Sequence, residues 1–287
     1  MYSDVYFLAL LLSIALVRQG SLWDLVASGK GREERTMAAN SNIGWTDHTQ
    51  NFWWGCHKVS DECRFCYIAG IMRRGGFEPF KGPMRTKTWD NPHRWNRAAK
   101  CKSHRARVFT CSMSDFFHPG ADQWRDEAWQ VISECQSLDW LILTKRADRI
   151  AECLPEDWGD GYPNVWLGVT AGCQSSLSRV EALLTIPAAV RFISAEPLLE
   201  RINLQPFLSG IDWVITGCER ARKGKRRIMD LDWVRDIDSQ CRAADVAHFF
   251  KQYYINDSGV PCEDGVLDKS RRQAWPKGKI AVDHTAL

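Results

Sequence analysis

From residue 105 onward, short apolar runs alternate with longer stretches in which apolar residues recur at helical spacing. The short runs are rich in branched and aromatic residues, as in strands buried on both faces, and they span residues 107–112, 139–144, 164–170, 190–194, 212–216 and 247–251. The helical stretches between them include residues 122–136, 178–184 and 231–243. This alternation predicts strand–helix units around a parallel sheet. With one more strand before Cys56, it predicts an α/β fold of the partial (β/α)6 barrel type.

Polar residues follow each predicted strand abruptly. In parallel barrels, the carboxyl ends of the strands form one rim, and that rim carries the active site. The side chains that we expect at this rim are Ser112, Ser114, Asp115, Lys145, Glu196, Glu219, Lys251 and Gln252. Lys145 suits a carboxylate or phosphate, and Glu196 suits a ribose hydroxyl or an amine. Each could equally belong to a buried structural ion pair.

Three cysteines, Cys56, Cys63 and Cys66, lie within residues 54–67, directly after the first predicted strand. Three thiolates on one loop can hold an iron–sulfur cluster and leave one coordination position open. Two other interpretations remain, which are a structural zinc site with a distant fourth ligand and coincidence in a chain of 11 cysteines. Both metal interpretations need deprotonated thiols and a cytosol-like environment. The other eight cysteines lie singly, mostly beside apolar residues, as buried small side chains do.

Composition fits one enzyme domain, because 287 residues with 45% hydrophobic content can bury a core of barrel size. The net charge of +3 neither requires nor excludes a nucleic acid partner. A local cluster exists at Arg220–Arg227, where six of eight residues are cationic. This segment is either a solvated loop or a phosphate contact. The chain has 14 tryptophans, several of them near the cysteines. We expect them to pack in the core and at the rim more than to stack on nucleic acid bases.

The first 36 residues differ from the rest of the chain. An apolar run from Val5 to Val17 resembles a signal segment but follows Asp4 instead of basic residues, and it is short for a membrane span. Met37 is therefore the more plausible start, and a membrane anchor is the alternative. The predicted organisation is an extension at residues 1–36, a barrel at 37–255 with a cluster loop at 54–67, and a tail or cap at 256–287.

Several motifs together resemble one known family. They are residues 44–56, the cysteine loop, and residues 112–118, 143–146, 165–169, 194–199 and 249–252. This set is similar to the phage and prophage three-cysteine-motif proteins related to radical S-adenosylmethionine (SAM) enzymes, and the resemblance covers roughly residues 41 to 255. It implies a radical SAM-like barrel in a cytoplasmic protein without stable membrane association.

The resemblance also implies a chemistry. A [4Fe–4S] cluster on Cys56, Cys63 and Cys66 would bind SAM, and one electron from a flavodoxin- or ferredoxin-like donor would cleave it to a radical that abstracts hydrogen from a substrate. Phe65 would lie against the adenine, with ordinary loop packing as its alternative role. Ser112, Ser114 and Asp115 would bind the methionyl amine. The substrate expected is a nucleic acid or nucleotide, and the competing function is a non-catalytic zinc- or cluster-binding interaction protein.

The chain departs from the family pattern at two places on the predicted rim. Cys218 stands where relatives have a second glycine before the acidic residue that is Glu219 here, so a close backbone approach is in doubt. Residues 170–174 lack the acidic residue expected after that strand. Ligand binding at both segments is therefore expected to differ from that in the relatives.

Overall fold

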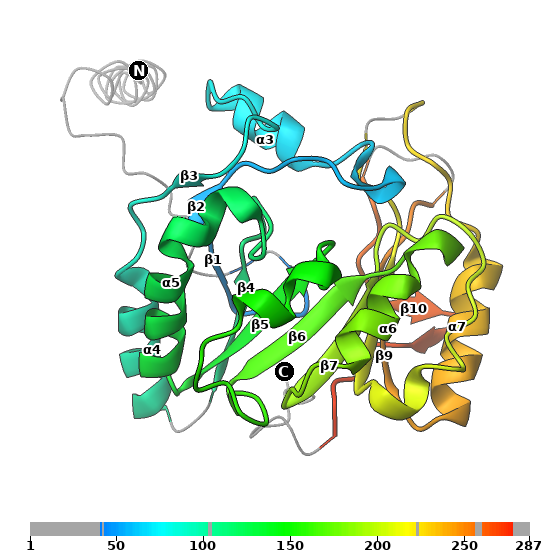
Figure 1. Ribbon diagram of the computed structural model, residues 1–287. Coiled ribbons are helices and arrows are strands. Elements are labelled where there is room, and N and C mark those ends of the chain that lie inside the picture. Colours follow the sequence, from blue (N-terminus) through cyan, green and yellow to red (C-terminus); the bar gives the residue numbers. More distant parts are fainter. Residues whose placement is uncertain (1–40, 42, 103–104, 222–223, 256–259, 278–287) are drawn as a thin grey trace, which may run out of the picture. The chain divides into compact units, whose positions relative to one another are not determined.

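The computed structural model describes residues 41, 43–102, 105–221, 224–255 and 260–277 (Figure 1). The predicted extension at residues 1–36 lies outside these residues. Among the helices of the described part, none is long and apolar enough to cross a membrane.

A single parallel sheet of seven strands forms the centre of the described chain (Figure 1). Its strands pair in the order in which they occur along the sequence, and the sheet curls into a half-barrel. They are β1 (His48–Gln50), β4 (Ala106–Thr110), β5 (Leu138–Thr144), β6 (Val165–Thr170), β7 (Val190–Ala195), β8 (Trp213–Gly217) and β9 (Ala247–Gln252). The predicted parallel sheet of a partial α/β barrel is confirmed, because the apolar runs become strands covered on both faces.

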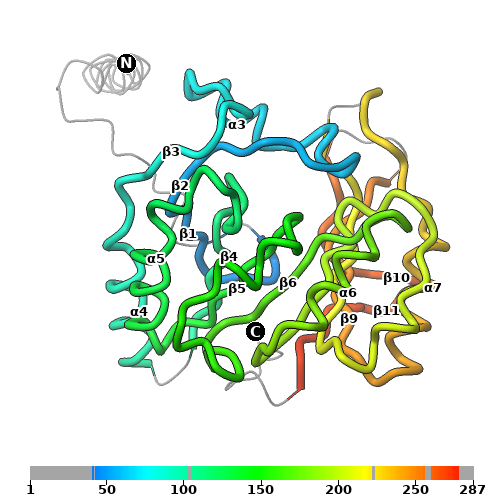
Figure 2. The backbone as a smooth tube through the Cα atoms, in the orientation of Figure 1, coloured from blue at the N-terminus to red at the C-terminus, as the bar shows by residue number. Residues whose placement is uncertain are grey.

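Helices connect these strands and cover one face of the sheet (Figure 2). Three were predicted from their periodicity and are confirmed, namely α5 (Asp122–Glu134), α6 (Ser178–Leu184) and α7 (Leu231–Ala243). Two more, α3 (Ile68–Arg74) and α4 (Asn91–Cys101), were not predicted. In α4 the buried residues are only Pro92, Trp95 and Ala99, so its apolar face is too narrow to stand out among polar residues.

Shorter elements complete the connections. Two strand pairs lie outside the main sheet, β2 (Trp53–Trp54) with β3 (Met84–Arg85) and β10 (Val266–Leu267) with β11 (Ser270–Arg271). The single 3-10 turns are η1 (Asp61–Cys63), η2 (Pro119–Ala121), η3 (Ala147–Arg149), η4 (Ala151–Cys153), η5 (Gln174–Ser176) and η6 (Leu208–Gly210).

The core consists of two apolar layers on the two faces of the sheet. Alternate residues of each strand pack beneath the helices, and the others fill the concave face. The concave layer is largely aromatic and comprises Trp45, Phe109, Leu141, Trp166, Val190, Phe192, Trp213, Ile215 and Phe249. A Cβ atom on Gly168 would lie 2.4 Å from the Phe192 ring, so this layer has no spare room. The prediction that tryptophans mainly serve packing is confirmed for Trp45, Trp53, Trp89 and Trp95.

The described part of the predicted tail or cap, residues 260–277, packs against β9 and the concave layer. Gln273 forms a β-bridge with Phe249, and the Trp213 indole nitrogen donates to the Ala274 carbonyl over 2.8 Å. The Trp275 ring lies 5.1 Å from that of Phe249. These contacts cover one end of the concave layer and leave the carboxyl ends of the strands to the cysteine loop.

Candidate functional site

The cysteine loop, residues 54–67, crosses the carboxyl ends of the strands (Figure 1). It is tied to the segment after β4, where the Gly55 amide donates to the Met113 carbonyl over 3.0 Å and the Tyr67 hydroxyl to the Ser112 carbonyl over 2.6 Å. It is tied to the segments after β5 and β6 through Arg146 and Arg179. The loop therefore lies over the rim at which active sites of parallel barrels form.

The three thiols of this loop are free and partly buried. Burial and the nearby Asp115 charge raise the pKa of Cys56 to about 11, and burial also raises the pKa of Cys66. Burial acts on Cys63 in the same direction, but the Lys145 charge and backbone hydrogen bonds outweigh it, so the pKa of Cys63 is lowered. The charge of Cys63 acts on both other thiols, which places the three near one another.

The loop offers sulfur donors for either kind of metal centre. Among the described residues, no three His, Cys, Asp or Glu side chains are grouped closely enough to bind one metal ion. Three thiolates suit a cluster with one open iron position, and they equally suit a zinc site with a fourth ligand from elsewhere.

Arg146 is a site residue that the sequence analysis missed. Its buried guanidinium lies 3.6 Å from the Cys56 sulfur, 3.2 Å from the Asp115 carboxylate and 3.0 Å from the His57 carbonyl. Strand β5 ends at Thr144, where the Arg146 amide donates to the Thr144 hydroxyl over 2.8 Å and the chain turns. The strand pattern in the sequence therefore does not show where the Arg146 side chain lies. The one available signal was the position of Arg146 within the motif at residues 143–146.

Asp115, predicted to bind the methionyl amine, has both carboxylate oxygens occupied within the protein. One accepts from the Thr144 hydroxyl at 2.7 Å and the Phe117 amide at 3.0 Å. The other accepts from the Lys145 amide at 3.0 Å and pairs with Arg146. Asp115 is therefore part of a buried ion pair, a role that the sequence analysis considered for Lys145 and Glu196 and not for Asp115.

Ser112 and Ser114, predicted to act beside Asp115, are also engaged locally. The Ser112 hydroxyl lies 3.2 Å from the Asn51 side-chain nitrogen, and the Ser114 hydroxyl donates to the Gly55 carbonyl. The Asn51 side-chain oxygen in turn accepts from the Met113 amide over 2.8 Å. This group joins the end of β4 to the start of the cysteine loop, so it positions the loop.

Lys145 directly follows the end of β5 and is partly exposed at the rim. In the described residues, no carboxylate lies within ion-pair distance of its ammonium group. Its charge reaches Cys63 and Cys66, whose pKa values it lowers. An anionic group held by Lys145 would therefore lie beside the thiols.

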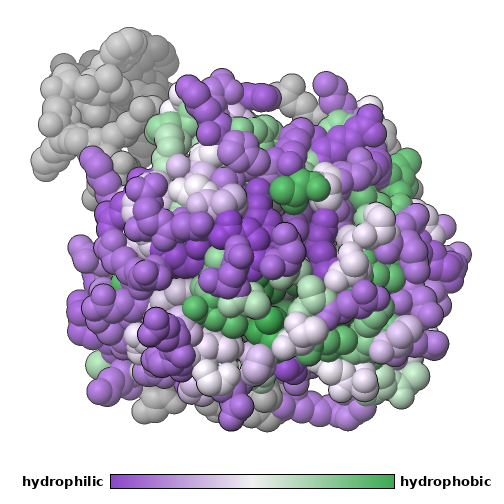
Figure 3. Space-filling model, viewed as in Figure 1, coloured by the Kyte–Doolittle hydropathy of each residue, from purple (hydrophilic) through white to green (hydrophobic). Residues whose placement is uncertain are grey.

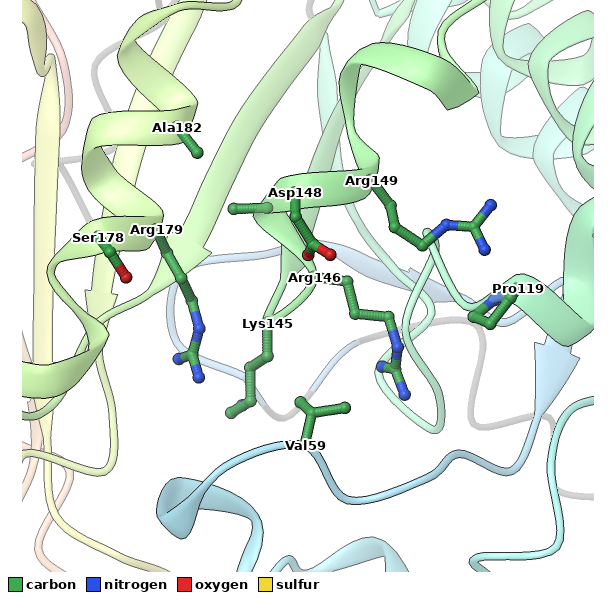
Figure 4. Close-up of a pocket in the computed structure, with 10 residues that line it drawn as sticks. Val59, Pro119, Lys145, Arg146, Asp148, Arg149, Ser178, Arg179 and Ala182 are labelled. Atoms are coloured by element: carbon green, nitrogen blue, oxygen red, sulfur yellow. The ribbon is translucent and has the colours of Figure 1, made fainter.

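An open pocket of about 600 Å³ borders Lys145 (Figure 4). In Figure 4 the side chains of Lys145 and Arg146 extend toward Val59 of the cysteine loop, and Arg179 extends from α6 beside them. Four of the residues that line the pocket are cationic and only Asp148 is acidic, the full lining being Val59, Pro119, Lys145, Arg146, Ala147, Asp148, Arg149, Ser178, Arg179 and Ala182. The pocket wall thus presents nitrogen donors near the cysteine loop.

Glu196 forms an ion pair across the barrel mouth with Lys251, whose ammonium lies 2.6 and 2.9 Å from the two carboxylate oxygens. The Gln252 amide donates to Glu196 over 3.1 Å. Gly217 lies beneath this group, and a Cβ atom there would come within 3.3 Å of the Glu196 side chain. Cys218 is buried, and burial together with Glu196 raises its pKa to about 12, so the thiol stays protonated.

Glu219 is buried and binds Arg227, whose backbone nitrogen and Nε lie 2.9 and 3.2 Å from one carboxylate oxygen. The same guanidinium donates to the Asp61 carbonyl over 3.0 Å and lies 5.6 Å from the Phe65 ring. Arg64 also lies near that ring, at 5.3 Å. The predicted cofactor residues Phe65 and Glu219 are thus joined through Arg227, a residue of the basic segment.

Most other described cations of the basic segment Arg220–Arg227 contact side chains of the protein itself. Arg220 pairs with Glu263 at 2.6 Å, and the Arg226 guanidinium lies 3.5 Å from the centre of the Tyr254 ring. Arg222 and Lys223 lie outside the described residues. Of the described cations in this segment, Lys225 is the one that lies exposed without such a contact.

Glu62 supplies an acidic group at the position after β6 where the sequence has none. Its side chain is fully buried and pairs with Arg179 at 3.0 Å, and the Gly172 amide donates to it over 3.4 Å. Burial raises the pKa of Glu62, but hydrogen bonds from Ser60 and the charge of Arg179 outweigh burial and lower it to about 2. Residues 170–174 have no acidic residue of their own, and the cysteine loop brings Glu62 to this segment.

His57 and His118, for which the sequence shows no partner, bind each other. His57 Nδ1 lies 2.9 Å from His118 Nε2, and the Gly120 amide donates to His118 Nδ1 over 3.0 Å. Burial and the charge of Arg146 lower the pKa of His118 to about 4. His118 is therefore neutral near pH 7 with its proton on Nε2, and it donates to His57.

Residues 40–276 match a family model described as "Protein of unknown function (DUF5131)". The chain belongs to the DUF5131 family. No curated protein and no solved structure matches it. The match covers the half-barrel, the cysteine loop and the described part of the C-terminal segment, so the whole candidate site lies within the family region.

The candidate site of this DUF5131 protein gathers some of the predicted residues at one rim and engages others in ion pairs. The structure brings the cysteine loop, Lys145 and the Glu196–Lys251 pair to one rim, whereas Asp115 and Glu219 are engaged by arginines. Arg146, Arg179 and Glu62 were missed, because their importance lies in pairings between segments far apart in the sequence.

Proposed function

We propose that this DUF5131 protein is a radical SAM-type enzyme that binds a [4Fe–4S] cluster through Cys56, Cys63 and Cys66. The observation that supports this most strongly is the cysteine loop lying across the carboxyl ends of a parallel half-barrel. A three-cysteine cluster at that rim keeps one iron position for a second ligand. The motif resemblance, which covers most of the family region, favours SAM as that ligand.

The three thiols lie on one loop, as the ligands of a three-cysteine cluster would. When bound, the cluster would supply the electron that cleaves SAM and produces a hydrogen-abstracting radical. The protein would contribute binding, orientation and exclusion of water.

The chain's own residues suit distinct tasks in this scheme. Arg146 donates toward the Cys56 sulfur and so favours its thiolate form, while Asp115 holds Arg146 in place. Lys145 suits a carboxylate beside the cluster, such as that of SAM. Phe65 keeps its proposed place against the adenine, with Arg227 fixing its loop to the rim.

The test is anaerobic reconstitution of the full chain with iron and sulfide, followed by reduction with dithionite in the presence of SAM and an assay for 5′-deoxyadenosine. A Cys56→Ala, Cys63→Ala, Cys66→Ala variant removes the proposed ligands. The matched control replaces three other cysteines that are not fully buried, Cys101, Cys173 and Cys262, with alanine.

We expect cluster absorbance and 5′-deoxyadenosine with the native chain and the control variant, and neither with the ligand variant. Tight binding of zinc without a cluster would overturn the proposal in favour of an interaction protein with a structural metal. A cluster without cleavage of SAM would restrict the chain to cluster binding and would also contradict the proposed enzyme.

A further inference from the structure

Positive charge is unevenly distributed along the chain. Residues 57–102 contain 11 Lys and Arg against four Asp and Glu, whereas the remainder of the chain contains 27 against 31. The segment thus has a net charge of +7 and the remainder a net charge of −4, which the overall value of +3 conceals. This segment begins in the cysteine loop and continues through α3, β3 and α4.

Most of these cations are exposed and unpaired. Eight of them form what we call the basic face, and no carboxylate in the described residues pairs with any of the eight, namely Arg73, Arg74, Lys81, Lys87, Arg94, Arg97, Lys100 and Lys102. The segment's own acids without a pairing cation are only Glu78 and Asp90. Both signs of charge occur on this segment, but cations outnumber acids far more than on an ordinary solvated surface.

Exposed apolar side chains accompany the basic face. Of the seven large hydrophobic residues that are exposed in the described chain, four lie in this segment, Val59, Tyr67, Phe77 and Met84. Tyr67 and Phe77 are aromatic and each 42% exposed. Cations interspersed with exposed rings are the pattern by which proteins bind single strands, with phosphates on the cations and bases on the rings.

The elements that carry these residues extend along one side of the protein. In Figure 1 the chain runs from the cysteine loop through α3 and β3 down to α4 along one edge of the view, and Figure 3 shows mainly hydrophilic residues along that edge. The basic segment Arg220–Arg227 is a weaker candidate, because Arg220, Arg226 and Arg227 contact the protein itself.

We propose that the basic face, together with Tyr67 and Phe77, binds single-stranded nucleic acid. A series of exposed cations without carboxylate partners neutralises a phosphate backbone, and the rings accept unstacked bases. Tyr67 is the last residue of the cysteine loop, so a strand bound to the face and to this ring would reach that loop. The proposal does not require a cluster in that loop, so its failure and that of the proposed enzyme are separately visible.

The test measures binding of fluorescein-labelled oligothymidylate and oligouridylate to the full chain by anisotropy over a series of salt concentrations. The test variant carries Arg73→Gln, Arg74→Gln, Lys81→Gln and Lys87→Gln. The matched control carries Arg201→Gln, Lys225→Gln, Arg235→Gln and Lys277→Gln, which removes the same charge from exposed positions elsewhere. A Phe77→Ala variant tests stacking, and a duplex of the same length tests strand preference.

We expect the test variant to lose roughly tenfold or more in affinity, with a salt slope smaller by about 0.7 for each phosphate contact removed. Phe77→Ala should lose roughly fivefold or more with an unchanged slope. Equal losses in the control, tighter binding of duplex, or no binding by the native chain would overturn the proposal. Binding of an acidic flavodoxin in place of the oligonucleotides, lost in the test variant, would overturn it and assign the face to a protein partner.

Discussion

At the scale of single residues, the candidate site depends on a buried ion pair. Arg146 and Asp115 are both at least nine-tenths buried, and between them they contact Cys56, His57, Thr144 and the backbone of two segments. A buried charge is costly unless it is paired and hydrogen-bonded, and here both conditions are met. The pair therefore fixes the position of the first cysteine relative to the ends of β4 and β5.

Breaking this pair should destabilise the protein strongly. We expect Arg146→Met and Asp115→Asn each to lower the free energy of unfolding by about 3–5 kcal/mol, because each leaves a buried group without its partner. The double variant should lose less than the sum of the two single losses. Urea unfolding measures all three. Arg235→Met, which removes an exposed ion-pairing arginine, is the control and should cost far less. Additive losses would show that the two residues act independently.

At the scale of elements, ion pairs at the middle of the cysteine loop hold it against the sheet. Glu62 enters the space after β6 and pairs with Arg179 of α6, and Arg227 binds Asp61 from the segment after β8. Of the three thiols, that of Cys56 also contacts an arginine of the rim, Arg146. The loop is therefore held over the rim by its acidic residues, and its cysteines remain available as ligands.

Removing the Glu62–Arg179 ion pair should increase the mobility of the cysteine loop without unfolding the half-barrel. In a Glu62→Gln variant, we expect amide hydrogen exchange in residues 54–67 to accelerate roughly tenfold or more, while exchange in β5 and β6 stays unchanged. Mass spectrometry of peptides measures this. Asp61→Asn in the same loop, where the acid is exposed, is the control with a smaller effect. Equally faster hydrogen exchange in the loop and in the sheet would contradict a local role of Glu62.

A second element-scale network joins α7 to the sheet on the helical side. The His248 Nδ1 hydrogen donates to Asp238 over 3.0 Å, and His248 Nε2 lies 2.9 Å from the Thr216 hydroxyl. Burial raises the pKa of Asp238, but its hydrogen bond from His248 and the charges of Arg272 and Arg242 outweigh burial and lower it. The lower pKa makes this network a source of acid sensitivity.

Because the pKa of Asp238 is lowered in the folded protein, this network loses stability at acidic pH. The stabilisation by Asp238 is fully present above the pKa of an unfolded aspartate, about 3.9, and is lost as the pH falls through the lower folded value. We expect an Asp238→Asn variant to be less stable than the native chain at pH 7 and to lose less stability on acidification below about pH 4. Urea unfolding across this range measures both. Parallel pH profiles for the two proteins would contradict the assignment.

At the scale of the whole molecule, stability and the candidate chemistry reside in different parts. The two apolar layers of the half-barrel contain the large buried side chains, and the cysteine loop lies outside both of these layers. Folding is driven chiefly by burial of apolar surface. The fold should therefore not require a metal centre in the loop.

A variant with alanine at Cys56, Cys63 and Cys66 should thus remain folded. We expect its cooperative thermal transition to persist, with a change in the free energy of unfolding within about 1 kcal/mol of the metal-free native chain. Circular dichroism and calorimetry measure this. Loss of the transition in the variant, or in the native chain after chelation, would indicate a structural metal as in zinc-dependent domains.

The sequence by itself determined the strands, three helices, the parallel order and the position of the cysteine loop, because apolar periodicity depends on neighbouring residues. It missed α4, whose apolar face is narrow, and it assigned Asp115 and Glu219 to ligands although arginines occupy them. The tertiary structure alone decided those pairings and the entry of Glu62 after β6. These features join residues far apart in the chain, and their energies arise only when folding removes the paired groups from water.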